Sequence, residues 1–189
     1  ARSLAARFSS SKTLSVRMNS PYLRFILVSL VLVALQVWVL SPIALFRIAT
    51  PFLYPILLLL LPIGTGRSTQ AFLGFGIGML IDIFSLTPGL HATAFTLTAY
   101  LRQPLLNLFV DKNTPEYTLP LYPTLRGGAV VLFSLLLFIH LTVLFALEAG
   151  LQGASLHLGM SFLASYAFSW VLHLITLFFF GTSEGARTN

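Results

Sequence analysis

The feature that most constrains this chain is a succession of apolar segments, each close to the length of one membrane-crossing helix. The hydrocarbon core of a bilayer is ~30 Å thick, and ~20 helical residues cross it. Only 8% of the 189 residues are charged, whereas a soluble domain has about 25%. The sequence therefore predicts an all-α integral membrane protein with six transmembrane helices and no soluble domain. The expected crossings are residues 23–40, 43–63, 70–86, 90–108, 127–147 and 156–180.

The third and fourth of these crossings are predicted to form a hairpin. The Thr-Pro-Gly sequence at residues 87–89 ends the third helix and reverses the chain. Gly74, Gly78 and Asp82 recur at intervals of four, which places them on one face of that helix. The two glycines allow another helix to approach closely. A carboxylate in an apolar helix needs a partner, so we expect Asp82 to accept hydrogen bonds near the turn.

Prolines interrupt the second crossing at Pro51, Pro55 and Pro62. Because proline removes a backbone donor and kinks a helix, this crossing is predicted to be short and kinked or partly unwound. We expect a short interfacial piece at residues 43–49 and a short helix from about Pro51. Carbonyl groups at residues 49–53 must then find donors in neighbouring helices, in water or in another protein.

The two ends of the chain are polar. Residues 1–20 contain four basic residues, six serines and no acidic residue. This composition suits a disordered basic arm at a membrane surface, a start site that really lies at Met18, or an organelle transit peptide. The basic residues recur every five positions and scatter around a helix, which favours the arm. The predicted organisation is an arm at 1–20, a transmembrane domain at 21–181, with a proline-rich loop at 111–124, and a polar tail at 182–189.

The net charge of +6 indicates an orientation in the membrane. With six crossings, both termini lie on one side, and Arg67, Lys112 and Arg126 join them there. Arg47 is the one basic residue expected on the opposite side. The positive-inside rule therefore predicts cytoplasmic N- and C-termini in a multi-pass membrane protein. We expect no nucleic-acid partner, because no basic stripe with interleaved aromatics lies outside the crossings.

Four polar residues inside the crossings are predicted to be structural. His91 lies beside the turn, within reach of Asp82 if the hairpin is tight. His140 lies deep in the fifth crossing, and counting along an antiparallel sixth crossing places Ser169 at its depth. We expect a hydrogen bond between these two helices in preference to a proton relay. Arg102 is expected to extend to the cytoplasmic headgroups, with an ion pair to a partner protein as the alternative.

The sequence predicts no enzyme and no cofactor. It contains no Gly-x-Ser-x-Gly, no His-Glu-x-x-His and no P-loop, and its glycines lack the strand context of a dinucleotide site. There is no cysteine. Asp82, His91, Glu148 and His157 all fall at the same end of the bundle and could form a metal or acid–base cluster. Their generic spacing favours hydrogen bonds at helix ends over such a cluster.

The run GFGIGMLIDIFSLTPGLHATAFTLTAYLRQP resembles the MreD family of integral-membrane rod shape-determining proteins. Residues 36–66 look like the variant of this family seen in Bacteroidota-type bacteria, and the resemblance covers roughly residues 22–181. It implies a fold like that of the substrate-binding S-components of energy-coupling-factor vitamin transporters. It also implies a place in the bacterial inner membrane and a partnership with MreC, a single-span periplasmic protein. Through MreC the family is linked to RodA, a class B penicillin-binding protein and MreB.

The expected function is thus that of a non-enzymatic membrane scaffold in the bacterial cell-elongation complex, which binds MreC and supports lateral peptidoglycan synthesis and cell shape. Gly74, Gly78, Asp82, Pro51 and Pro55 are the candidates for packing against the partner's helix or against helices of this chain. One alternative is a vitamin-capture subunit of an energy-coupling-factor-type transporter, since a fold does not determine a function. Another is an inner-membrane protein of an organelle.

Overall fold

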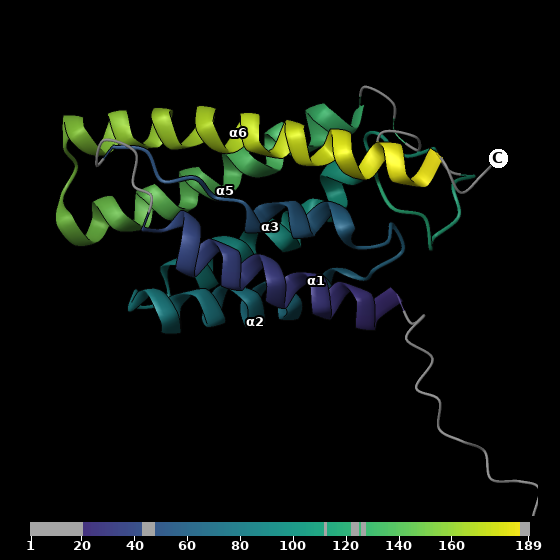
Figure 1. Ribbon diagram of the computed structural model, residues 1–189, viewed down its shortest axis with the longest axis horizontal. Helices are drawn as coiled ribbons and strands as arrows, with labels where there is room; N and C mark the ends of the chain where they lie inside the picture. Colours follow the sequence, from purple (N-terminus) through teal and green to yellow (C-terminus); the bar gives the residue numbers. More distant parts are fainter. Residues whose placement is uncertain (1–20, 43–47, 112, 122–124, 126–127, 186–189) are drawn as a thin grey trace, which may run out of the picture.

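The protein is an all-α bundle (Figure 1). The computed structural model describes residues 21–42, 48–111, 113–121, 125 and 128–185, and this part of the chain contains no β-sheet. The predicted arm at residues 1–20 and most of the interfacial piece at 43–49 lie outside the described residues. In chain order the elements are α1 (Pro21–Leu35), a π-helical turn (Gln36–Leu40), a 3-10 helix (Tyr54–Leu60), α2 (Arg67–Ser85), α3 (Leu90–Leu106), α5 (Gly128–Gln152) and α6 (Leu156–Gly185).

The helices run back and forth along one long axis, so the bundle has two distinct ends (Figure 1). The α2–α3 turn and the α5–α6 turn lie at one end, which we call the turn end. The start of α1 and the end of α6 lie at the other, which we call the terminal end. The described part of the chain therefore enters and leaves the bundle at the same end.

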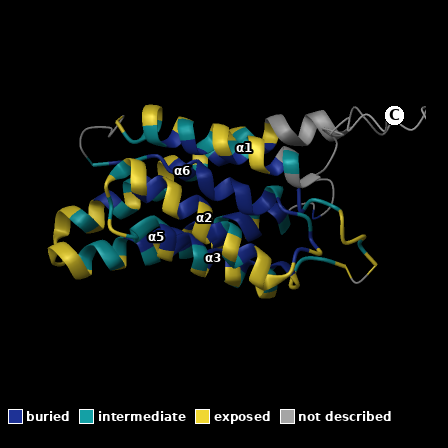
Figure 2. Cartoon of the chain, turned by 90° about the horizontal axis from the view of Figure 1, so that it is seen from below, coloured by how far each residue is buried: buried dark blue, intermediate teal, exposed yellow. Residues whose placement is uncertain are grey.

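Among the described residues, three helices are long and apolar enough to cross a bilayer: Arg67–Ser85, Gly128–Gln152 and Leu156–Phe178. A shorter apolar helix covers Phe25–Leu40. Large apolar side chains face outward from these helices, among them Val31, Phe72 and Leu163, which are 66%, 78% and 66% exposed. The exposed positions lie along the outside of the bundle (Figure 2). A water-soluble protein would hide such a surface, so this composition and exposure indicate a multi-pass membrane protein.

The predicted hairpin is present as α2 and α3, which pack closely along their length. Leu86, at the end of α2, and Gly89, before α3, have φ values of 55° and 77°. Positive φ costs glycine little, and Gly89 here precedes the first turn of α3. The turn residue Thr87 donates its backbone N–H to the carbonyl of Asp82, 3.1 Å away. The turn is therefore closed by local hydrogen bonds, as the Thr-Pro-Gly sequence indicated.

Helices α5 and α6 are longer than predicted. The turn expected at residues 148–155 is helical as far as Gln152, where the Gln152 amide donates to the Glu148 carboxylate across one helical turn. Gly153, with φ of 89°, ends α5, and the Ser155 hydroxyl accepts from the Leu158 N–H to cap α6. Helix α6 continues to Gly185, beyond residue 180, where the sixth crossing was predicted to end.

The segment predicted as the second crossing lies in the middle of the bundle and is only partly helical. Residues 50–53 belong to no helix, and the 3-10 helix Tyr54–Leu60 follows. Proline removes a backbone donor, which accounts for the loss of regular α-helical hydrogen bonding around Pro51 and Pro55. Residues 54–59 are all buried, with exposures of 2% or less for Tyr54 and for the four residues that follow Pro55. The predicted short, partly unwound element is thus buried in the core, in contact with α1, α3 and α5.

Candidate functional site

The interior of the bundle contains a polar clamp around the non-helical segment, residues 50–53. Gln36, in the π-helical turn after α1, is 1% exposed and reaches this segment with both ends of its amide. Its nitrogen donates to the Pro51 carbonyl at 2.9 Å, and its oxygen accepts from the Leu53 N–H at 2.8 Å. One glutamine side chain therefore replaces two hydrogen bonds that a regular helix would have supplied to its own backbone.

Helix α6 supplies the other half of the clamp. The Ser165 hydroxyl oxygen accepts from the Thr50 N–H at 3.0 Å, and that of Ser169 accepts from the Phe52 N–H at 2.8 Å. The ring of His173 places Nε2 3.0 Å from the Leu53 carbonyl oxygen. Ser165, Ser169 and His173 are each 0% exposed. Their spacing of four residues puts them on one face of α6, and this regularity is the sequence signal that could have pointed to the clamp.

Tyr54 connects the clamp to a second buried polar group. Its hydroxyl lies 3.0 Å from His91 Nδ1 and within hydrogen-bond distance of His140 Nε2. The other ring nitrogen of His140 lies 3.5 Å from the hydroxyl of Thr98, which itself donates to the Ala94 carbonyl at 2.7 Å. Because the Thr98 proton is used in that bond, an assignment with the proton on His140 Nδ1 lets Nε2 accept from Tyr54 and lets the Tyr54 oxygen accept from His91.

Asp82 holds the hairpin together at the turn end. It is 3% exposed and lies in the last turn of α2. One carboxylate oxygen accepts from the Thr87 hydroxyl and from the His91 N–H, and the other accepts from the Ala92 N–H at 2.8 Å. The two amides belong to the first turn of α3, whose unpaired N–H groups and positive dipole end favour an anion. The partners of this buried carboxylate are thus the turn and the start of the next helix, and the hydrogen bond from His91 comes from its backbone.

The predicted hydrogen bond between His140 and Ser169 was wrong. Both residues are buried and both make contacts between elements, but they face different neighbours. His140 bonds to Tyr54, and Ser169 bonds to the backbone of Phe52. Helices α5 and α6 are instead joined by Ser134, whose hydroxyl accepts from the Trp170 indole N–H at 2.8 Å. Depth along antiparallel helices was a poor guide, because the rotation of each helix about its own axis decides which residues meet.

Arg102 does not extend to a headgroup region, and that expectation was wrong as well. Its side chain is 0% exposed, and Nη2 donates to the Leu61 carbonyl at 2.6 Å. The Nε and Nη1 groups have no hydrogen-bond partner in the described part of the chain. The next residue, Gln103, accepts from Gln70 at 2.8 Å. Arg102 is therefore an interior residue that holds the end of the second crossing against α3, and it is not accessible to a carboxylate of another protein.

The glycine face of α2 is filled by α3 of the same chain. A Cβ at Gly78 would lie 2.5 Å from Ala92 Cα, and one at Gly74 would lie 2.9 Å from Ala99 Cβ. Of the two roles considered for these glycines, packing within the chain is the one observed. Pro51 and Pro55 are also buried, and the clamp already supplies hydrogen bonds to residues 50–53. These positions are closed to a partner helix.

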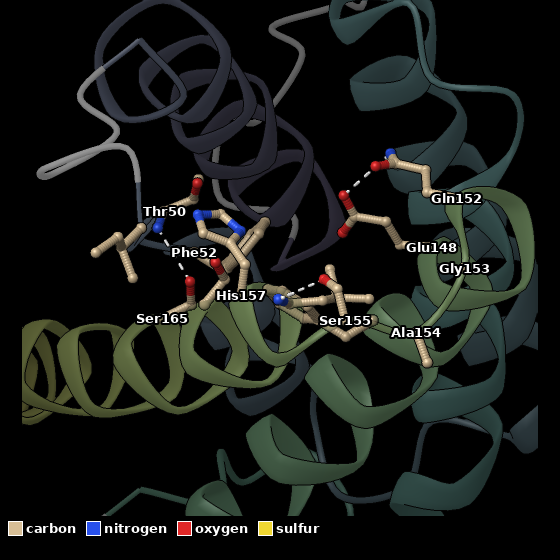
Figure 3. Close-up of a pocket in the computed structure, with 13 residues that line it drawn as sticks. Thr50, Phe52, Glu148, Gln152, Gly153, Ala154, Ser155, His157 and Ser165 are labelled. Carbon is tan, nitrogen blue, oxygen red and sulfur yellow. Dashed lines mark hydrogen bonds between the residues drawn. The ribbon is translucent and has the colours of Figure 1, made fainter.

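A pocket of about 400 Å³ opens at the turn end, where the α5–α6 turn meets residues 48–52. Figure 3 shows Thr50 and Ser165 on one side, Glu148 and Gln152 on the other, and His157 between them. Ser161, Phe52 and Phe145 also line it. The described residues contain no group of three or more acidic, histidine or cysteine side chains able to hold a metal, so the metal cluster considered for Asp82, His91, Glu148 and His157 is not formed there.

Comparisons of the chain with protein-family models, with curated proteins and with solved structures gave no match.

Proposed function

We propose that this protein is a non-enzymatic scaffold of the bacterial inner membrane that binds the transmembrane helix of MreC within the cell-elongation complex. The proposal starts from the resemblance of residues 22–181 to the MreD family. In this view the chain takes part in lateral peptidoglycan synthesis and cell shape by holding MreC, and through it RodA, a class B penicillin-binding protein and MreB. The protein itself contributes surfaces and carries out no reaction.

The observation that carries this proposal is a closed interior combined with an open apolar exterior. The clamp satisfies the unwound second crossing from inside, and α3 fills the glycine face. What remains available to a partner in the membrane is the outside of the bundle. In lipid, helices associate by close packing and not by hydrophobicity. A partner is therefore expected where the outside offers close approach.

The outer face of α2 offers such an approach. We define it by Phe72, Phe75, Gly76, Met79 and Ile83, all exposed. A Cβ at Gly76 would meet nothing within 4 Å, so this glycine lies in open space between large side chains. Spacings of four, three and four along residues 72, 76, 79 and 83 align them on one side of the helix. We propose this face as the docking surface for MreC, in place of Gly74, Gly78, Pro51 and Pro55.

The proposed topology has six crossings with the terminal end in the cytoplasm. Helices α1, α2, α3, α5 and α6 and the buried second crossing each traverse the bundle (Figure 1). Arg67 lies at the terminal end, at the start of α2, and the basic residues that precede α1 adjoin the same end in sequence. The positive-inside rule supports this orientation.

Affinity capture of the tagged full chain in mild detergent tests the proposal. We expect an MreC relative among the co-purifying proteins. Gly76→Leu should reduce its recovery, because the added side chain fills the outer face of α2. Gly159→Leu is the matched control, since a Cβ at Gly159 on α6 would also meet nothing within 4 Å. Absence of MreC, or an equal loss with both variants, would contradict the proposal.

A second candidate function is capture of a small molecule, as in a vitamin-binding transporter subunit. The observation that favours it is the pocket at the turn end, where hydroxyl, imidazole and carboxylate groups line one cavity. Pockets for small ligands commonly have volumes of ~300–1,000 Å³ and combine apolar walls with a few polar groups. The two candidates are compatible, because the pocket and the outer face of α2 are formed by different residues.

A further inference from the structure

We propose that the pocket at the turn end binds a small organic molecule that carries a protonated amine beside an aromatic or alkyl group, and that it rejects the corresponding acid. This inference rests on the second candidate function and names the chemical class of the ligand. It is independent of the scaffold proposal, since none of the residues involved belongs to the outer face of α2.

The carboxylate of Glu148 determines the sign of the ligand charge that the pocket favours. It is the one carboxylate among the described lining residues, and these include no lysine or arginine. Its carboxylate accepts one hydrogen bond, from Gln152 at 3.3 Å, so acceptor positions remain for a ligand. Glu148 is only partly exposed. An ammonium group gains from a carboxylate in such a place, whereas a carboxylate or phosphate is repelled by it.

Ser161 adds a hydroxyl group to the lining of the same pocket. Its side chain is 8% exposed, and its hydroxyl makes no hydrogen bond to another described residue. A ligand that supplies a donor or acceptor can form a hydrogen bond with this hydroxyl. Ser165, one turn further along α6, is already engaged by the Thr50 N–H. Ser161 is therefore the available group on this wall.

Two aromatic rings give the pocket an apolar side. Phe52 is 6% exposed, and its ring lies 6.0 Å from the ring of His91 and 6.4 Å from that of Tyr54. Phe145 lines the pocket from α5. Because Phe52 is fixed by the clamp and by these ring contacts, this wall is rigid. A ligand with one apolar flank and one cationic or hydroxyl end matches the arrangement.

The test compares phenethylamine, 2-phenylethanol and phenylacetate, which share a ring and differ in their polar end. Binding to the purified full chain in lipid nanodiscs is measured by titration calorimetry. We expect the amine to bind most tightly, the alcohol about tenfold or more weakly, and the acid not at all, because a hydrogen bond to a charged group is worth more than a neutral one. Glu148→Gln should remove the preference for the amine. Glu116→Gln, which changes a carboxylate outside the pocket, is the control.

Two further variants locate the site. Ser161→Val should weaken both the amine and the alcohol, and Ala154→Phe, a change at an exposed lining residue, should do the same by filling the pocket without altering the core. Binding of the acid as tight as that of the amine, with loss in Ala154→Phe, would overturn the ligand class and leave the capture function standing. No binding of any compound, or binding unaffected by Glu148→Gln and Ala154→Phe, would overturn both.

Discussion

Replacing Gly78 by alanine distinguishes the cost of overpacking between α2 and α3 from the gain in helix propensity. A Cβ at residue 78 would lie 2.5 Å from Ala92 Cα, 2.6 Å from the His91 carbonyl oxygen and 2.7 Å from the Ala92 nitrogen. All three atoms belong to the backbone of α3, so no side-chain rotation relieves the contact, and α2 and α3 must move apart. Gly76 provides the matched control, because a Cβ there meets nothing within 4 Å.

The magnitude follows from these distances. Ordinary contact begins at 3.4 Å, so the helices must separate by about 1 Å, and overpacking of this kind costs ~1–3 kcal/mol. The same movement stretches the 2.8 Å hydrogen bond from the Ala92 N–H to Asp82. Alanine returns up to ~1 kcal/mol through its helix propensity. We therefore expect Gly78→Ala to lower the free energy of unfolding by about 1–2 kcal/mol, and Gly76→Ala to leave it unchanged or raise it.

Gly74→Ala should fall between the two. Its nearest contacts would be Ala99 Cβ at 2.9 Å and the Phe95 carbonyl oxygen at 3.0 Å, which are less severe than those at Gly78. The measurement is denaturant-induced unfolding of the purified chain in detergent micelles, with all three variants under identical conditions. If Gly78→Ala proved as stable as Gly76→Ala, the close approach of α2 and α3 would not be a feature of the folded protein.

Four further predictions concern the buried polar groups, and each is measured by the same unfolding experiment. Asp82→Leu leaves two amide N–H groups of α3 without an acceptor and should lower the free energy of unfolding by ~2–6 kcal/mol. Asp82→Asn keeps one acceptor and should cost about half as much. Equal losses would show that the negative charge matters and the number of acceptors does not. Tyr54→Phe removes the hydroxyl between His91 and His140 and should lower the free energy of unfolding by ~1–3 kcal/mol. The double variant with His140→Leu should regain part of this loss, because the imidazole left without a partner is removed as well. If the double variant regained none of it, the hydrogen bond assigned between Tyr54 and His140 would be contradicted. Ser169→Ala should cost ~1–3 kcal/mol and Ser165→Ala less, since the Phe52 amide is buried and that of Thr50 only partly so; the reverse order would count against the clamp. Arg102→Met should not lower stability, because it removes a buried charge with two unpaired donors; a clear loss would mean that these donors have partners.

The hairpin could be predicted because its signals are local. The Thr-Pro-Gly turn, the glycines at intervals of four and the buried carboxylate all lie within a stretch of about twenty residues, and local periodicity is the strongest structural signal in a sequence. The short, partly unwound second crossing was likewise readable from its prolines.

Contacts between distant segments could not be read in the same way. The partner of His140 depends on which way α5 is rotated, and the structure turns it toward Tyr54 and Thr98. Arg102 lies four residues before the end of α3, and this position suggested that its side chain would be exposed. In the structure, residues 61–65 pack against this end of α3 and cover the side chain. The backbone of this segment is in turn paired with the loop, through hydrogen bonds from Ile63 and Gly64 to the carbonyls of Thr118 and Glu116. Neither arrangement leaves a periodic trace in the sequence.

We propose that the interior of the bundle is closed and that MreC docks on the outer face of α2. Cysteine crosslinking tests this most directly, because the chain contains no native cysteine. Single cysteines are placed at Phe75 and Met79 on the outer face, at Leu53 and Ile77 in the interior, and at Leu135 on the exposed side of α5, each opposite a cysteine in the MreC span. We expect crosslinks at Phe75 and Met79 and none at the other three. Crosslinks at Leu53 or Ile77 would contradict the closed interior, and crosslinks at Leu135 alone would contradict docking on α2.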